Sequence, residues 1–91
     1  MPTAHRLRPE DEPFIPVVYE FIRQRTRDGS FWVQGSDLFR EFKAFTYEQG
    51  LPSCGVGAMA RIVERAGYPR RNMGKGPNRV AGHDGLSLIR R

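Results

Sequence analysis

Apolar side chains recur at intervals of three and four residues in three stretches of the chain, and this spacing predicts three amphipathic helices. The first starts near Pro16, because proline fits the first turn of a helix, and stops at the turn signal Asp28-Gly29. Residues 1–13 contain prolines and mixed charges but no periodic apolar face. We therefore expect residues 1–13 to be an extended or mobile leader and residues 14–91 to form one domain.

The second and third helices have caps and apolar stripes that can be read directly. The second is capped by Ser36 or Asp37 and closes at Gly50, with apolar positions at Leu38, Phe39, Phe42 and Phe45. The third is capped by Ser53 and ends at Gly67, and its apolar stripe consists of Val56, Met59, Ile62, Val63 and Ala66. Its opposite face is expected to carry Ala58, Arg61 and Arg65.

Short aromatic and β-branched runs between turn residues predict three strands. One covers residues 31–34, after the first helix, and two more follow Arg70, where glycines are too frequent for a helix. A loop at residues 74–78 joins these two, and the second of them either runs through Val80 or resumes at residues 86–89. The predicted fold class is α+β: a winged helix-turn-helix with three helices, a short strand after the first and a C-terminal two-stranded β-hairpin as the wing.

Three segments of the chain also resemble a known family: VQGSDLFREFKAFTYEQGLPS, MARIVERAGYPRR and the ending GLSLIRR. They are similar to the C-terminal winged-helix module of phage and plasmid primase-helicases of the D5-like type. In that module the second helix has the form S-D-L-x-x-x-F and ends in Gly, the third ends in Gly plus an aromatic residue, and the wing closes on G-x-x-L. The resemblance covers roughly residues 15–91. It implies a stand-alone winged helix of phage or mobile-element type, because the chain has no G-x-x-x-x-G-K-[ST] loop and no helicase domain.

Basic residues concentrate in the second half of the chain. The formal net charge is +5 and the sequence pI is about 10.1. Residues 1–50 have a net charge of −1, whereas residues 51–91 hold eight Arg and Lys against two acidic residues, a net charge of +6. All ten aromatic residues lie at or before Tyr68, so the basic part has no ring on which a base can stack. This distribution favours phosphate contacts to duplex DNA over stacking on single strands.

Two basic elements are candidates for contact with DNA. In the third helix, Arg61 and Arg65 lie one turn apart and can pair with guanine in the major groove, while Ser53 lies near a phosphate at the helix N-terminus. In the hairpin, Lys75 and Arg79 can lie against the backbone or in a minor groove. The complete predicted DNA-binding set is Ser53, Arg61, Arg65, Arg70, Arg71, Lys75, Arg79, Arg90 and Arg91.

Reactive residues form no catalytic pattern. The single cysteine, Cys54, rules out an internal disulfide, and no histidine is placed to activate its thiol beside the predicted helix N-terminus. His5 and His83 lack the spacing of zinc ligands, and His83 with Asp84 fits a glycine-flanked turn better than a catalytic dyad. We therefore expect no enzyme activity, metal, cofactor or small-molecule substrate.

Two aromatic residues have alternative interpretations. Trp32 fits a small core better than an exposed partner-binding anchor, and Tyr68 either donates its hydroxyl to a phosphate or packs against the wing. The favoured function is a non-catalytic duplex DNA-binding protein, and the alternative is a winged helix that binds another protein. The sequence has no apolar run long enough to cross a bilayer and no signal peptide, so we expect a cytoplasmic protein without a membrane partner. The sequence does not decide whether the protein forms a homodimer, or whether it acts in repression, activation, excision or replication.

Overall fold

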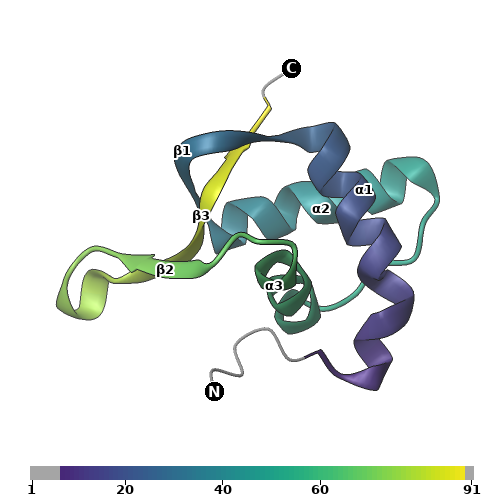
Figure 1. Ribbon diagram of the computed structural model, residues 1–91, viewed down its shortest axis with the longest axis horizontal. Coiled ribbons are helices and arrows are strands. Elements are labelled where there is room, and N and C mark those ends of the chain that lie inside the picture. The colour runs from purple at the N-terminus through teal and green to yellow at the C-terminus, as the bar shows by residue number, and fades with distance from the viewer. Residues whose placement is uncertain (1–6, 90–91) are drawn as a thin grey trace.

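Three α-helices and a three-stranded antiparallel sheet make up residues 7–89, the part of the chain described by the computed structural model (Figure 1). In chain order, the 3-10 helices (η), α-helices and strands are η1 (Pro9–Phe14), α1 (Ile15–Arg25), β1 (Thr26–Gln34), α2 (Gly35–Gln49), α3 (Val56–Arg65), β2 (Arg70–Met73), η2 (Gly76–Asn78) and β3 (Val80–Leu88). The predicted α+β class is confirmed. Of the predictions made above, those for residues 1–6, Arg90 and Arg91 lie outside the described residues.

The first helix ends earlier than predicted, and the strand after it is longer. Thr26 has extended backbone angles (φ −136°, ψ 168°), and its hydroxyl donates a hydrogen bond of 2.6 Å to the carbonyl of Ile22. This bond satisfies a carbonyl of the last turn, which has no partner within the helix. The Asp28-Gly29 pair, predicted to end the helix, instead lies within β1, where the pairing with β3 shifts register between Asp28 and Trp32.

The other two helices begin at residues other than the predicted caps. Gln34 is the N-cap of α2, and Gly55 is the N-cap of α3, two residues after Ser53. The predicted end of α2 is confirmed, because Gly50 has a left-handed conformation (φ 66°) that only glycine adopts readily. The amide of Leu51 closes this turn with a 2.9 Å bond to the carbonyl of Thr46.

The three helices pack around a cluster of phenylalanines. Phe21 of α1 lies between two rings of α2: its centroid is 5.5 Å from that of Phe42, edge to face, and 5.6 Å from that of Phe45. All three rings are fully buried. Three residues of α3 and one from each of two strands also belong to the core. They are Met59, Ile62 and Val63 of α3, Val33 of β1 and Leu86 of β3. Leu38 and Phe42 therefore lie in the core as the sequence predicts, but Val56 does not, since it is 58% exposed.

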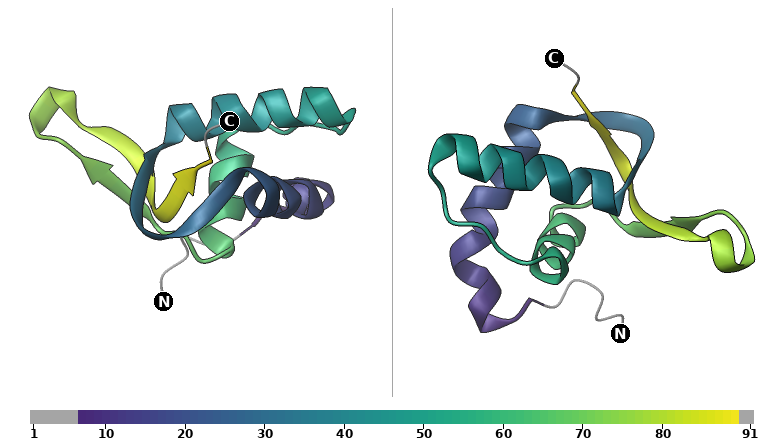
Figure 2. Two further views of the ribbon diagram at one scale, coloured as in Figure 1. Left: turned by 90° about the horizontal axis from the view of Figure 1, so that it is seen from above. Right: turned by 180° about the vertical axis from the view of Figure 1, so that it is seen from behind.

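The sheet extends from one side of this helical core. Its strand order is β1-β3-β2, so β3 is the central strand and pairs antiparallel with both neighbours. The two predicted alternatives for the last strand, Val80 and residues 86–89, are both explained by β3, which runs without a break from Val80 to Leu88. Beyond the pair of Gln34 and Gly82, the hairpin of β2 and β3 is no longer paired with β1, and it projects away from the helices (Figures 1 and 2).

The described part of the predicted leader is folded. Residues Pro9–Phe14 form η1, which packs on α1 and α3, and the side chain of Asp11 is only 1% exposed. Proline followed by three acidic residues is a pattern typical of a helix N-terminus, because the helix dipole favours negative charge there. This pattern, which begins at Pro9, indicates a helix, and the prediction of an extended leader did not take it into account.

Candidate nucleic-acid interface

The projecting hairpin carries the strongest local concentration of positive charge. Arg70, Arg71, Lys75 and Arg79 are all exposed, as the sequence predicts for a hairpin too narrow to bury them. No acidic residue occurs between Arg70 and His83. The tip is a single turn of 3-10 helix, η2, with Lys75 directly before it and Arg79 directly after it. These two cations therefore lie at the outer end of the hairpin, where the helices do not cover them (Figure 2).

Arg71 differs from the other hairpin cations because it has an acidic partner. Its Nε donates to the carboxylate of Asp84 at 2.7 Å, across the β2–β3 pair. Half of the Arg71 side chain remains exposed. Its charge is thus partly balanced, and part of its role is to hold the two strands together.

The base of the hairpin is held by Trp32. The indole Nε1 donates a 2.9 Å hydrogen bond to the backbone carbonyl of Arg71, so the side chain reaches from β1 across the central strand to β2. It passes over Gly82, where an added Cβ would stand 2.3 Å from Cζ2 of Trp32. Trp32 is therefore a structural residue of the sheet, and its polar atom is engaged within the chain.

Arg61 does not lie free on the solvent side of α3, where the sequence analysis placed it. Its Nε and Nη2 form a bidentate ion pair with the carboxylate of Asp11, at 2.8 and 3.0 Å. The backbone amide of Arg8 also donates to Asp11, at 3.0 Å. The bonds from Arg61 and then from Arg8 lower the pKa of Asp11 from 3.8 to about 2, and Asp11 in turn raises the pKa of Arg61. Arg61 thus anchors η1 on α3.

The remaining predicted residues of α3 and the loop before it are placed as follows. Arg65 is exposed in the last turn of the helix. Ser53 is exposed but precedes the N-cap by two residues, and its hydroxyl lies 3.5 Å from the carbonyl of Cys54, so it does not cap α3 as predicted. Cys54 is buried, and that burial raises the pKa of its thiol, which leaves it in the unreactive protonated form.

Tyr68 and His83 are both engaged within the chain. The Tyr68 hydroxyl donates to the carboxylate of Asp28, which raises the pKa of Tyr68 to about 12. This hydroxyl is therefore not offered to a phosphate. His83 lies within β3, not in the predicted turn, and its Nδ1 is 3.0 Å from the Tyr68 carbonyl. Burial lowers the pKa of His83, so it stays neutral at physiological pH.

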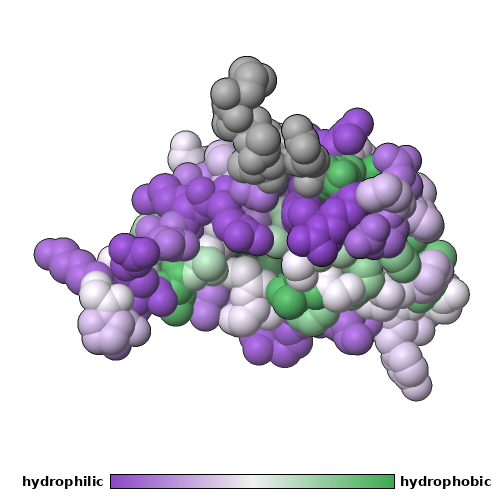
Figure 3. Space-filling view, turned by 90° about the horizontal axis from the view of Figure 1, so that it is seen from below, coloured by the Kyte–Doolittle hydropathy of each residue, from purple (hydrophilic) through white to green (hydrophobic). Residues whose placement is uncertain are grey.

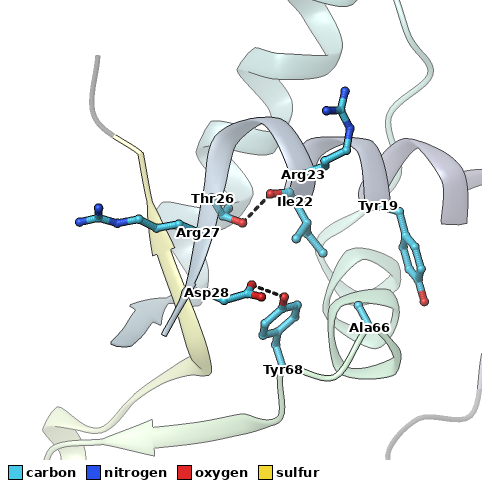
Figure 4. A pocket seen from close by; sticks show the side chains of 8 residues that line it. All are labelled: Tyr19, Ile22, Arg23, Thr26, Arg27, Asp28, Ala66 and Tyr68. Carbon is cyan, nitrogen blue, oxygen red and sulfur yellow. Dashed lines mark hydrogen bonds between the residues drawn. The ribbon is translucent and has the colours of Figure 1, made fainter. Parts of the chain in front are cut away.

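A hollow of about 430 Å³ lies beside this Tyr68–Asp28 hydrogen bond, between α1 and β1 (Figure 4). Two more of its polar side chains have partners: the Thr26 hydroxyl donates to the carbonyl of Ile22, and Arg23 pairs with Glu20. The side chains of Arg23 and Arg27 point away from its centre (Figure 4). The hollow therefore presents no converging polar groups for a substrate.

Within residues 7–89, no three His, Cys, Asp or Glu side chains gather as ligands for a metal ion. None of the helices in this part of the chain is both long and apolar enough to cross a membrane. Compared with known proteins, the chain matches no protein-family model, and no curated protein is similar to it in sequence. The resemblance to primase-helicase modules therefore stays a prediction.

The Asp11–Arg61 pair gives stability that depends on pH. Because the pKa of folded Asp11 is about 2 and its ordinary value is 3.8, its contribution is complete above about pH 5 and disappears as the pH falls through 2. Asp11→Asn is expected to have a lower melting temperature than the parent at pH 7. The melting temperatures of the two proteins should converge near pH 2. Melts followed by circular dichroism from pH 2 to 7 measure this gap.

The matched control is Asp37→Asn, which removes an exposed carboxylate paired with Arg40 on α2. Exposed pairs and carboxylates at a helix start each contribute little to stability, so this variant should stay much closer to the parent than Asp11→Asn at every pH. A gap for Asp11→Asn that stays constant down to pH 2 would mean that the lost stability does not come from the ionised carboxylate.

Proposed function

We propose that this protein is a non-catalytic duplex DNA-binding protein with a winged helix-turn-helix fold. The element order supports the fold: three helices with a strand between the first two, then a hairpin whose second strand is central in the sheet. In this fold the third helix approaches the major groove and the hairpin forms a wing on the flanking backbone. Here α3 is the recognition helix, and β2, η2 and the start of β3 form the wing.

The observation that carries the proposal is the charge of this wing. It holds four exposed cations, only one of which has a carboxylate partner, and it projects beyond the helices (Figure 1). Isolated cations on a protruding hairpin contribute nothing to packing, but they can each neutralise a phosphate and release a condensed counterion. The wing also contains no aromatic residue, which favours the backbone of a duplex over unstacked bases.

The division of roles differs from the one predicted from sequence. Arg61 is engaged with Asp11 and is removed from the set of base-reading residues, and Ser53 is removed from the helix cap. Phosphate contacts are assigned to Arg65, Arg70, Lys75 and Arg79, with a smaller share for Arg71. Arg90 and Arg91 follow β3 in the sequence and keep the role predicted for them.

The decisive experiment is a salt titration of binding to a random-sequence duplex, for the parent and for Lys75→Ala/Arg79→Ala. Each phosphate contact contributes about 0.9 to the slope of log K against log salt, so the double variant should lower the slope by about 2. Its affinity should fall roughly tenfold to fiftyfold at 0.1 M salt, by similar factors for all sequences. Fluorescence anisotropy of a labelled duplex measures both quantities.

Two exposed cations far from the wing provide the control. Arg23→Ala/Arg40→Ala makes the same change in net charge, but both residues lie on α1 and α2 in pairs with acidic neighbours. This variant should keep the slope of the parent. Equal slopes for all three proteins would remove the wing from the interface, and a flat slope for the parent would favour the protein-binding alternative.

A further inference from the structure

The free face at the start of α3 is made of hydrocarbon. Val56, the first residue of the helix, is 58% exposed, and Gly57 beside it is exposed as well. Across from them, Val80 at the start of β3 is 39% exposed. Val56 is not part of the buried core, which in α3 begins with Met59. We call Val56, Gly57, Ala60 and Val80 the apolar patch.

The apolar patch lines a groove of about 400 Å³ between α3, the base of the wing and the start of α2. Ser36 of α2 and Arg70 of β2 add polar atoms at its sides, and none of its described lining residues is acidic. On the lower face of the molecule, pale and hydrophobic surface alternates with strongly hydrophilic rims (Figure 3). An apolar floor with one cation, Arg70, and no carboxylate at its edge suits a partner that is anionic outside and carries apolar groups inside.

Duplex DNA has this arrangement in its major groove. Phosphates border the groove, and the only apolar group on its base edges is the C5 methyl of thymine. Arg61, the long polar side chain that lies against Gly57, already has its Nε and Nη2 bound to Asp11. Nothing on the patch itself can donate a hydrogen bond to a base through a side chain.

We propose that the apolar patch contacts thymine methyl groups in the major groove, so that the protein selects A·T base pairs by apolar contact and not by arginine–guanine pairing. This inference rests on the proposed DNA-binding function. The glycine at position 57 permits a close approach of the helix backbone, because a side chain there would stand between the helix and the bases. Val56 supplies the largest apolar surface and is the main residue that determines the preference.

The test removes the methyl groups without changing base pairing. Binding is measured to an A·T-rich duplex and to the same duplex in which every thymine is replaced by uracil. Burial of one methyl is worth about a three- to fourfold change in affinity, so two contacted thymines should give roughly a tenfold preference for the thymine duplex. Val56→Ala should weaken binding to the thymine duplex and leave binding to the uracil duplex almost unchanged.

Tyr47→Ala is the matched control, since Tyr47 is an apolar side chain that is 89% exposed on α2, outside the groove lining. It should keep the preference of the parent for thymine. A preference that persists undiminished in Val56→Ala would overturn the assignment to the patch and attribute the effect to the shape of the duplex. Equal binding to both duplexes would overturn this inference alone, whereas no binding to either would overturn the proposed function as well.

Discussion

Replacing Phe42 by alanine is expected to lower the free energy of unfolding by about 3–5 kcal/mol. Phe42 is fully buried in the middle of α2, and its ring meets that of Phe21 edge to face at 5.5 Å. The substitution removes this contact and leaves a cavity, which the three helices can close only by shifting toward one another. Because small domains have only about 5–15 kcal/mol of stability, the loss takes a large part of the total. Urea unfolding followed by circular dichroism measures it.

Phe39→Ala provides the comparison on the same helix. Phe39 is only partly buried, one turn before Phe42, and its ring lies beside the ammonium of Lys43 at 5.8 Å. Its removal opens no closed cavity, so the loss of stability should be clearly smaller. If the two variants unfold at the same urea concentration, the phenylalanine cluster is not the centre of the core.

The helices could be predicted because their signals are local. Phe42 and Phe45 follow the 3.6-residue period that places them on one face, and Gly50 marks a left-handed helix end that other residues adopt at a cost. Neither signal depends on what packs against the helix. Helix starts were less accurate, because any extended residue can serve as N-cap: Gln34 and Gly55 do so here without a side-chain hydrogen bond.

The last strand was obscured by its glycines. Gly82 and Gly85 act as turn signals when read alone, and they led to the placement of His83 and Asp84 in a turn. In the fold Gly82 lies in the central strand because the indole of Trp32 occupies the space of a side chain. The glycine is thus explained by a residue 50 positions earlier, which no local pattern contains.

The sequence correctly predicts that a cation of the candidate interface is exposed where the local fold leaves no way to bury it. It fails where the exposure of the side chain depends on a partner far away in the sequence. Lys75 and Arg79 lie in a narrow hairpin that has no interior, so their exposure follows from the sequence. Arg61 has the same helical pattern as an exposed arginine, but Asp11, 50 residues away, pairs with it. With Arg61 engaged, the exposed Val56 becomes the main feature of the free face of α3.

Replacing Gly82 by alanine is the second change with a large expected effect. A Cβ at this position would stand 2.3 Å from Cζ2 of Trp32 and 2.3 Å from the backbone carbonyl oxygen of Val33. The indole can rotate away, but the carbonyl belongs to β1, so β1 and β3 must separate. Overpacking typically costs 1–3 kcal/mol, and loss of the hydrogen bond from Trp32 to Arg71 adds about 1 kcal/mol. We expect a loss of about 2–4 kcal/mol in total.

Trp32 reports this change directly, because it is the only tryptophan in the chain. Displacement of its indole into water should shift the fluorescence emission of Gly82→Ala to longer wavelength. Since the indole fixes the base of the wing, the variant should also bind duplex DNA more weakly while keeping all of its cations. Gly57→Ala is the control for stability and emission alone: its added Cβ meets only the flexible end of Arg61, at 3.4 Å, so the variant should be at least as stable as the parent and keep its emission. Parent-like emission and unfolding in Gly82→Ala would mean that Trp32 does not cover β3, and that the direction of the wing is set by the pairing of β2 and β3 alone.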